Sequence, residues 1–332
     1  DLKAEQETQG YDFTSDTDTE VIAHAIHKAL KDSSTLLEAT QKAIQTFEGA
    51  YGVGVISPKD PGCIIAARSG SPLVIGLSDK GNFIASDQMA LLDITKEFIF
   101  LEEGDVAEIT LKSVTIYDKD GNKVEREIKI SKLKSGQVSK RGYDHYMLKE
   151  IFEQPQAIRD TLESRITKDT VLTSAFGHEA KQIFKDTKQI QIIACGTSYN
   201  AGLVAKYWLE DIAKIPAHIE VASEYRYRQP IVLDNTLFIT ISQSGETADT
   251  LEALKAVKKY NTNIHSLAIC NTAESSLTRE SELTFLTHAG PEIGVASTKA
   301  FTTQLVSLAL LSVAIGKCHN QVSKQQELKI VE

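Results

Sequence analysis

The sequence predicts an α+β domain followed by an α/β domain with a parallel sheet. In the first third of the chain, two helix candidates precede a series of short strand candidates that are separated by turns. In the second half, strand candidates alternate with helical stretches, as the repetition of βαβ units requires. Between them, residues 119–143 are rich in Lys, Glu, Gly and Ser, which is typical of a linker.

The first domain is defined by its order of elements. Apolar residues at helical spacing predict helices over residues 18–30 and 36–47. Short runs rich in β-branched and aromatic residues then predict strands over residues 51–58, 63–68, 73–77, 82–85, 98–101, 108–111 and 114–117.

We place the domain boundaries from these patterns. The first domain spans residues 1–118, the linker spans residues 119–145, and the second domain with its leading helix spans residues 146–332. In that leading helix, Met147, Leu148, Ile151 and Phe152 form an apolar stripe, and Pro155 is expected to interrupt or restart it.

The second domain opens with a strand, a turn and a helix. Residues 189–194 read as a strand, Cys195, Gly196, Thr197 and Ser198 as a turn, and residues 199–213 as a helix. The large side chains of that helix are expected to point inward: Leu203, Val204, Tyr207, Trp208 and Ile212. Further strands are expected at residues 217–221, 236–241, 265–270 and 283–287.

A second unit of the same design follows. The strand at residues 236–241 ends in SQSGET at positions 242–247, and a helical pattern begins at Ala248. The first N–H groups of a helix lack intrahelical partners and carry the positive end of its dipole, so they suit an anion. Ser242, Ser244 and Thr247 add hydroxyl donors. The alternative is an ordinary cap, in which Ser244 binds the N–H of Thr247.

A third candidate turn, GVASTK at positions 294–299, precedes a long apolar helix over residues 300–315, which is also a candidate for a subunit or interdomain contact. The carboxyl ends of parallel strands meet at one edge of a sheet, which is where open α/β sheets bind ligands. We therefore expect the Cys195, Ser242 and Ser297 turns to converge at one edge of a sheet of about five parallel strands.

Composition narrows the class of function. The chain has 332 residues, of which 42% are hydrophobic, enough for two packed domains. Its net charge of −9 argues against a nucleic-acid surface. The longest apolar run, residues 305–315, is too short to span a bilayer, and no secretory signal is visible. Four cysteines without a dense pattern fit a reducing cytoplasm. The sequence has no CxxC pair and no cluster of histidines, so we expect neither a metal site nor a cofactor.

Four motifs of the second domain occur together in a specific order: ACGTS at 194–198, SEYR at 223–226, SQSGET at 242–247 and GVASTKAFTT at 294–303. In this combination the chain resembles a sugar isomerase (SIS) domain, and more narrowly the first SIS domain of the glutamine–fructose-6-phosphate aminotransferase family, the glucosamine-6-phosphate synthases. A lone SQSG would indicate only an SIS domain.

The first domain resembles the same family. The motifs SDTDTEVIAH at 15–24, ARSGSPL at 67–73, ASDQ at 85–88 and FIFLEEGD at 98–105 are similar to the later part of its class II glutaminase domain. The resemblance implies part of an αββα sandwich. It also implies that Asp18 holds the amino group of glutamine in the intact enzyme, whereas the simpler reading of Asp18 is a helix cap. HYMLKEIFEQP at 145–155 resembles the segment that joins the two domains.

By the resemblance, the second domain binds a sugar phosphate, either fructose 6-phosphate or glucosamine 6-phosphate. The main phosphate cradle is implied to be Ser242, Gln243, Ser244 and Thr247. The remaining contacts to the sugar and phosphate are implied for Cys195, Gly196, Thr197, Ser198, Val295 (through its backbone) and Ser297.

Several of these residues have a plainer reading. Cys195 has no evident base beside it and is read as packing or backbone contact rather than as a nucleophile. Ser297 could be another helix cap, and Glu246 is read as a first-turn carboxylate that complements the dipole of the helix after the SQSGET motif. Lys299 could offset phosphate charge or lie in solvent, and Arg226 and Arg228 are expected to form ion pairs.

The resemblance also implies parts that this chain does not hold. The family's glutaminase begins at a processed cysteine, whereas this sequence starts at Asp1 and its cysteines are Cys63, Cys195, Cys270 and Cys318. The family's second SIS domain carries its acid/base residues. We therefore expect a fragment without catalytic residues of its own, inactive as a glutaminase.

The resemblance implies an amidotransferase that makes glucosamine 6-phosphate and glutamate from fructose 6-phosphate and glutamine. It is expected to be a cytoplasmic homodimer or higher homo-oligomer without nucleic-acid or membrane partners. Two alternatives stay open at this point. A phosphosugar-sensing regulator would need a basic helix-turn-helix, which the strand-rich first half does not offer, and a bare phosphosugar isomerase would lack the glutaminase-like half.

Overall fold

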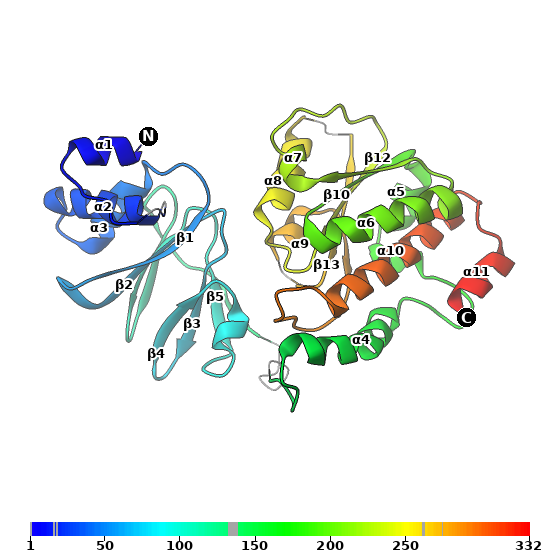
Figure 1. Ribbon diagram of the computed structural model, residues 1–332, viewed down its shortest axis with the longest axis horizontal. Helices are drawn as coiled ribbons and strands as arrows, with labels where there is room; N and C mark the ends of the chain where they lie inside the picture. The colour runs from blue at the N-terminus through cyan, green and yellow to red at the C-terminus, as the bar shows by residue number, and fades with distance from the viewer. Residues whose placement is uncertain (1, 16, 18, 132–138, 261–262, 274) are drawn as a thin grey trace. The chain divides into compact units, whose positions relative to one another are not determined.

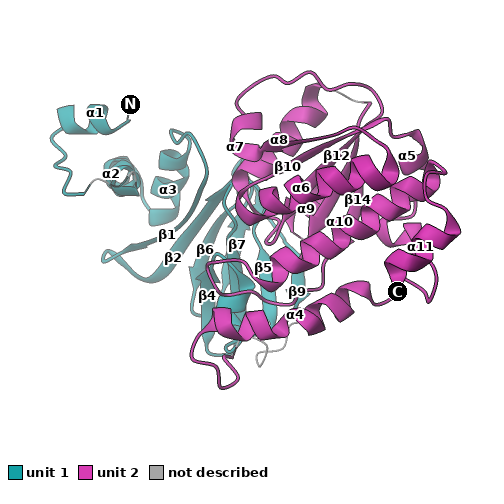
Figure 2. Ribbon diagram, turned by 45° about the vertical axis from the view of Figure 1, so that its right-hand side comes forward, with its two compact units in different colours: residues 1–136 teal, residues 137–332 magenta. Residues whose placement is uncertain are grey.

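A computed structural model describes residues 2–15, 17, 19–131, 139–260, 263–273 and 275–332 (Figure 1). The chain divides into two compact units, residues 1–136 and residues 137–332 (Figure 2). Each unit has its own core of buried apolar side chains.

The first unit begins with helices and continues with strands, as the sequence predicts. Its helices are α1 (Leu2–Thr8), α2 (Thr19–Ala29) and α3 (Leu36–Ile44), with short 3-10 turns at Leu30–Asp32 and Gln88–Leu91. Its strands are β1 (Tyr51–Ser57), β2 (Asp60–Ser69), β3 (Val74–Ser78), β4 (Gly81–Ala85), β5 (Glu97–Phe100), β6 (Val106–Thr110), β7 (Val114–Tyr117), β8 (Lys123–Val124) and β9 (Ile128–Ile130).

Three layers make up the first unit. One antiparallel sheet has the order β1-β2-β6-β7-β8 and the other has the order β4-β3-β5-β9. Successive side chains of a strand point to opposite faces, so β2 serves two cores. Its Ile65 packs against α2 and α3, while its neighbour Ala66 packs against the second sheet. This α+β arrangement is the predicted one.

The expected linker contains structure that the sequence pattern did not indicate. Strand β8 pairs with β7, and β9 pairs with β5, so each of the two sheets gains a strand from within residues 119–145. Short two- or three-residue strands with isolated apolar residues show no period that can be recognised.

Arg126 lies in the chain between β8 and β9 and binds the buried carboxylate of Asp105 through two hydrogen bonds of 2.8 and 2.9 Å.

The second unit alternates helices and parallel strands. Its helices are α4 (Tyr146–Leu162), α5 (Ala180–Asp186), α6 (Gly196–Trp208), α7 (Ala222–Tyr225), α8 (Ala248–Tyr260), α9 (Ser276–Glu280), α10 (Lys299–Cys318) and α11 (Lys324–Val331), with a 3-10 turn at Thr173–Phe176 and a π-helical turn at Leu209–Ala213. Its strands are β10 (Gln189–Ala194), β11 (Ala217–Val221), β12 (Thr236–Ser242), β13 (His265–Cys270) and β14 (Leu283–Leu286).

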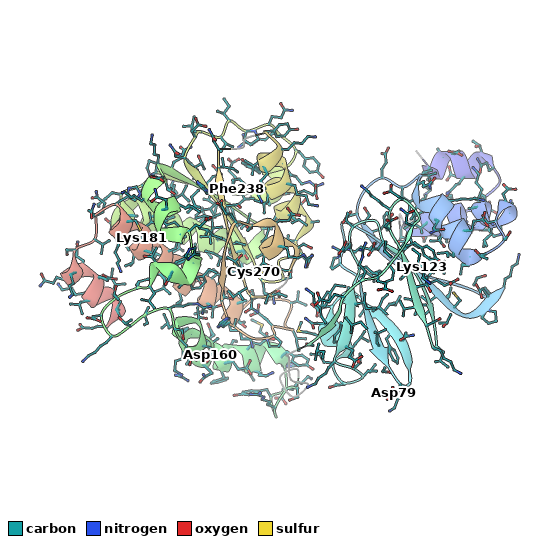
Figure 3. All side chains as sticks on the ribbon, turned by 180° about the vertical axis from the view of Figure 1, so that it is seen from behind. Asp79, Lys123, Asp160, Lys181, Phe238 and Cys270 are labelled. Atoms are coloured by element: carbon teal, nitrogen blue, oxygen red, sulfur yellow. The ribbon has the colours of Figure 1, made fainter. Side chains whose placement is uncertain are left out.

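The five strands of the second unit form one parallel sheet in the order β11-β10-β12-β13-β14, which confirms the predicted sheet of about five parallel strands. Helices cover both faces (Figure 1). On the central strand β12, Leu237 and Ile239 pack toward α5, α6 and α10, whereas Phe238, labelled in Figure 3, packs toward α7 and α8. All seven residues of β12 are buried, as expected for the centre of a doubly covered sheet.

Helix α4 differs from its prediction, because it runs without a break through Pro155. Proline cannot donate to the carbonyl four residues earlier, which here belongs to Ile151. The side-chain amide of Gln154 donates to that carbonyl instead, at 2.9 Å. This local replacement lets the helix continue, so the expected interruption is wrong.

The predicted inward face of α6 is only partly right: Trp208 and, just after the helix, Ile212 pack against the core, whereas Leu203 and Tyr207 do not. Leu203 is 38% exposed and Tyr207 is 72% exposed, whereas Ala201 and Ala205 are buried. A side chain at Gly202 would place its Cβ 2.0 Å from the Ile219 side chain on β11. The small residues therefore face the sheet because the helix lies too close to it for large ones.

Helix α10 has 20 residues and is longer than the apolar run at residues 305–315 that the sequence shows. By length and composition alone it could cross a membrane. However, 61% of its apolar window is buried inside the unit. Thirteen of its residues are buried, among them Leu308, Leu311 and Val313, so much of the helix belongs to the core under the sheet.

Candidate functional site: hydroxyl-bearing turns at the carboxyl edge of the sheet

Strands β10 and β12 lie side by side, but the chain leaves them in opposite directions. From β10 it passes to β11 on one side, and from β12 it passes to β13 on the other. A sheet of this order has its topological switch point between these two strands, where ligands of open α/β sheets bind. Ala194 pairs with Ile241, so both strands end at the same level. The first of the predicted turns is shorter than expected, because residues 196–198 already belong to α6. The segments at the two strand ends, residues 195–198 and 242–247, therefore share one edge of the sheet.

Hydroxyl groups shape the second of these turns. The Ser242 Oγ accepts the backbone N–H of Gly245 at 2.9 Å and lies 3.1 Å from Thr247 Oγ1. The Ser244 Oγ accepts the N–H of Glu246 at 3.1 Å, not that of Thr247, so the cap considered as the alternative is not formed. A hydroxyl that accepts a bond still has its own proton to donate. The turn can thus present O–H donors beside the first N–H groups of α8, which begins at Ala248.

Gly245 is required by the packing of this turn. Its φ of +70° lies in the left-handed region, and an added Cβ would lie 2.1 Å from Ser275 Oγ and 2.7 Å from Cys270 Sγ. The Gly245 carbonyl accepts the N–H of Leu277 at 3.0 Å. The turn is therefore held tightly against the segment that follows β13. Burial raises the pKa of the Cys270 thiol, which keeps it protonated.

The Glu246 carboxylate has a different role from the predicted one. Its Oε1 accepts the backbone N–H of Ser276 at 2.8 Å, at the start of α9. It does complement a helix N-terminus, but that of α9 rather than that of α8. Sequence spacing could not indicate this, because the two helices meet only through the fold.

The Cys195–Ser198 turn begins α6. Cys195 is partly buried and packs against the core on the α7 and α8 side, which agrees with the packing interpretation. Gly196 has a left-handed φ of +57°, and Thr197 is exposed. Ser198 is 8% exposed, and its Oγ accepts a hydrogen bond of 3.0 Å from the side-chain amide of Gln304 on α10.

The third predicted turn has its own set of hydrogen bonds, centred on Glu292. Val295 is fully exposed, and Ser297 Oγ donates to Glu292 at 3.0 Å. Glu292, not Ser297, caps α10, since it also accepts the N–H groups of Thr298 and Ala300 at 2.8 and 3.1 Å. No hydrogen bond within the described ranges links Val295 or Ser297 to residues 242–247.

Asn271, which the sequence analysis did not single out, connects these parts of the edge. Its backbone N–H donates to the Gln243 carbonyl at 3.3 Å, and its side-chain amide donates to the Gly290 carbonyl at 2.8 Å. Its Oδ1 accepts from Thr287 and from the N–H of Ala289. The sequence did hold a signal for this role, because Asn271 is a polar residue directly after a predicted strand, at the edge where the ligand was expected to bind.

The ion pairs at this end of the sheet are largely as expected. Arg226 binds Asp249, in the first turn of α8, at 2.7 Å, and this hydrogen bond raises the pKa of the arginine. Arg228 binds Glu220 on the edge strand β11. Lys299 does not lie in solvent, because it is only 4% exposed. Its ammonium group binds Glu153 of α4 at 2.7 Å, and no described hydrogen bond or ion pair joins it to the Ser242 turn.

Asp18, the predicted glutamine contact, lies outside the described residues. Within the described ranges, no group of three or more His, Cys, Asp or Glu side chains is placed to hold a metal ion.

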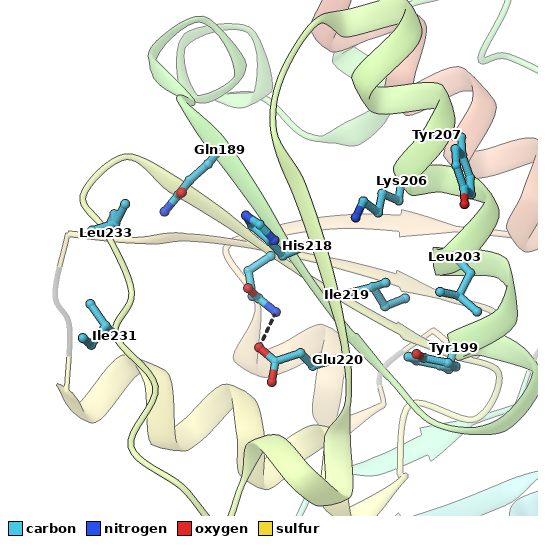
Figure 4. A pocket seen from close by; sticks show the side chains of 11 residues that line it. Gln189, Tyr199, Leu203, Lys206, Tyr207, His218, Ile219, Glu220, Ile231 and Leu233 are labelled. Carbon is cyan, nitrogen blue, oxygen red and sulfur yellow. Dashed lines mark hydrogen bonds between the residues drawn. The ribbon is translucent and has the colours of Figure 1, made fainter.

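A hollow of about 620 Å³ lies elsewhere, around the edge strand β11 (Figure 4). Its walls include the exposed side chains of Leu203, Tyr207 and Ile231, and Gln191 donates to Glu220 within it. None of the predicted site residues lines it. The hydroxyl-bearing turns and this hollow are thus separate features.

Comparison with known proteins assigns both units. Residues 183–314 match the model of the SIS domain, and residues 1–93 match that of a glutamine amidotransferase domain. The chain is 54% identical over 332 residues to a protein of Pseudomonas putida named glutamine–fructose-6-phosphate aminotransferase (isomerizing), covering 100% of this chain and 54% of that protein. A protein of the same name from Vibrio vulnificus is 53% identical over 326 residues, covering 98% of this chain and 53% of that one. The chain therefore spans about half the length of these relatives.

A solved structure agrees in fold. The C-terminal domain of glucosamine-fructose-6-phosphate aminotransferase from Francisella tularensis is 54% identical, with a TM-score of 0.57 over 58% of this chain and 54% of that chain.

Proposed function

We propose that the second unit of this chain binds fructose 6-phosphate and the reaction product glucosamine 6-phosphate. The proposal is supported by similarity along the whole chain to proteins named glutamine–fructose-6-phosphate aminotransferase. In the complete protein, glutamine would supply ammonia that converts fructose 6-phosphate to glucosamine 6-phosphate, with glutamate as the second product. The share of this chain in that reaction would be to anchor the sugar. The catalytic acid/base groups of the complete protein are expected outside this chain.

The observation that carries this proposal is the pair of hydroxyl-bearing turns at the switch point between β10 and β12. A phosphate monoester needs several donors, and a chain with a net charge of −9 has no evident excess of cations to supply them. Hydroxyls, backbone N–H groups and the positive ends of α6 and α8 can do so. We assign the phosphate to Ser242, Gln243, Ser244 and Thr247, and the sugar side to Cys195, Gly196, Thr197 and Ser198.

We also assign Val295 and Ser297 to the sugar site. Their segment is fastened by Glu150 and Glu292 rather than by the Ser242 turn. Glu150 accepts the N–H groups of Ile293 and Gly294, so the backbone near Val295 is fixed. A fixed backbone can line a pocket without a side-chain contact, which is the role proposed for Val295.

Phosphate anchorage fits the chemistry of the reaction. Binding energy from a remote phosphate fixes the sugar so that its reacting carbons are held still for ammonia and for proton transfer. The glutamine amidotransferase match over residues 1–93 supports an aminotransferase rather than a sugar-sensing regulator or a simple isomerase. We further propose that glutamine is bound through Asp18, and that the protein acts in the cytoplasm as a homodimer or larger homo-oligomer.

A thermal unfolding experiment tests the proposal. Fructose 6-phosphate at about 100 times its dissociation constant should stabilise the folded state by about 2.7 kcal/mol, which raises the melting temperature visibly. Unphosphorylated fructose at the same concentration should give little change. Equal effects of the two sugars would show that the phosphate is not what the edge recognises.

A further inference from the structure

The side chain of Gln304 joins α10 to the first turn of α6. Its Nε2 donates to Ser198 Oγ at 3.0 Å, across a separation of 106 residues. Gln304 is 2% exposed and Ser198 is 8% exposed, so water does not compete for this bond. Ser198 stands at the edge where β10 ends, beside the switch point of the sheet.

This bond determines what the Ser198 hydroxyl can do. A serine hydroxyl has one proton to donate and two lone pairs that accept. The amide of Gln304 occupies an accepting position, and it is the only hydrogen bond of the Ser198 side chain within the described residues. The hydroxyl proton therefore remains for an acceptor that comes from outside the protein.

The other end of the same amide carries a cost. Gln304 Oε1 is buried and has no hydrogen-bond partner among the described residues. A buried acceptor without a partner destabilises a fold, and an apolar side chain of similar length would avoid that penalty. Packing alone therefore does not account for glutamine at this position. Polar groups that a fold tolerates at such a cost are typical of functional sites.

We infer that Gln304 is a positioning residue, which holds Ser198 so that its hydroxyl donates to an oxygen of a bound sugar phosphate. This inference rests on the proposed function, because it assumes that the sugar phosphate occupies the edge at Ser198. Gln304 itself does not touch the ligand. It acts by occupying one accepting position of Ser198 while the hydroxyl proton stays available for the anionic substrate.

A turned amide would have the opposite effect. If an oxygen faced Ser198, it would take the hydroxyl proton, and the ligand would lose its donor. The variant Gln304→Glu produces that situation, because an ionised carboxylate can only accept. The variant Gln304→Met removes the bond but keeps an unbranched chain of similar length.

The test is a double-mutant cycle on the dissociation constant of fructose 6-phosphate, measured by calorimetry with the full chain. We expect Ser198→Ala and Gln304→Met each to weaken binding about three- to tenfold. The double variant should bind no more weakly than Ser198→Ala alone. Gln304→Glu should bind more weakly than Gln304→Met, and the melting temperature of Gln304→Met without ligand should equal or exceed that of the wild type.

Ser307→Ala is the matched control, since Ser307 is a buried polar residue of α10 whose hydroxyl, among the described contacts, bonds only to the Thr303 carbonyl. Its dissociation constant should equal that of the wild type. Two results would overturn the role of Gln304 and leave the proposed function intact. The first is that the losses of affinity add in the double variant. The second is that Gln304→Met and Gln304→Glu bind as the wild type does while Ser198→Ala binds more weakly. If Ser198→Ala binds as tightly as the wild type, Ser198 is not part of the proposed site. If the wild type does not bind fructose 6-phosphate, the proposed function is wrong. The inference about Gln304 fails in both cases.

Discussion

The Glu150 carboxylate on α4 lies 2.6 Å from the backbone nitrogen of Ile293, a residue 143 positions further along the chain. The same carboxylate accepts the N–H of Gly294 at 3.1 Å, and Glu150 is only 1% exposed. The helix that precedes the parallel sheet therefore holds the loop that leads into α10. This loop carries two of the predicted sugar contacts, Val295 and Ser297.

The first prediction follows from that relationship. Glu150→Ala should lower the free energy of unfolding by about 2–3 kcal/mol, because the partly buried N–H groups of Ile293 and Gly294 lose a charged acceptor. Urea denaturation of the variant and the wild type measures this difference. The exposed Glu163, at the end of the same helix, gives the control, and Glu163→Ala should change stability by less than about 0.5 kcal/mol. Equal stability of the two variants would show that the Glu150 bonds contribute nothing.

A second prediction concerns Gly245. Gly245→Ala should destabilise the fold by about 2–5 kcal/mol, since it combines a left-handed backbone with a Cβ 2.1 Å from Ser275 Oγ. Gly121→Ala is the matched control, because Gly121 has a φ of +80° but open space around its Cβ. The control should lose only about 1–2 kcal/mol from the backbone alone. A loss at Gly245 no larger than that at Gly121 would mean that the Ser242 turn is not packed as described.

The third prediction is a pH dependence. Burial alone would raise the pKa of Glu327, but hydrogen bonds from Lys317, Thr170 and the Val171 N–H outweigh it and lower the pKa below 4.5. A carboxyl with a lowered folded pKa stabilises the fold above its unfolded pKa, and that contribution disappears as pH falls through the folded value. The stability gap between the wild type and Glu327→Gln should therefore be full near pH 7 and shrink below pH 4.5. An NMR titration that gave Glu327 a pKa above 4.5 would contradict this.

The order of elements could be predicted from sequence because each pattern is local. Alternating or continuous β-branched runs indicated β10 and β12, and the hydroxyl-rich turns after them were visible without the fold. Their meeting at one edge followed from the rule that parallel strands share a direction. The prediction of a five-stranded parallel sheet is confirmed for these reasons.

Features that depend on approach between distant elements could not be predicted. Helix α6 turns Ala201 rather than Leu203 inward because Gly202 brings it close to Ile219, a distance no periodicity encodes. The buried Lys299 binds Glu153 of α4, and Glu246 accepts the backbone N–H of Ser276 at the start of α9. In each case, the outcome was decided by a partner far away in sequence or by a neighbouring element of the fold.

The central claim is that the Ser242–Thr247 turn is a phosphate cradle, and Ser244→Ala tests it most directly. Ser244 Oγ accepts only the neighbouring N–H of Glu246 among the described contacts, so its loss should affect the fold less than the loss of Ser242. Bonds to a charged group contribute about 1.5–3 kcal/mol, so the variant should bind fructose 6-phosphate about 10- to 100-fold more weakly. Ser223→Ala, on α7 outside the cradle, should bind within about twofold of the wild type. If Ser244→Ala binds the sugar phosphate as tightly as the wild type, both in this chain and in a protein with the full length of its relatives, the turn only begins a helix and the assignment of the phosphate to it is wrong.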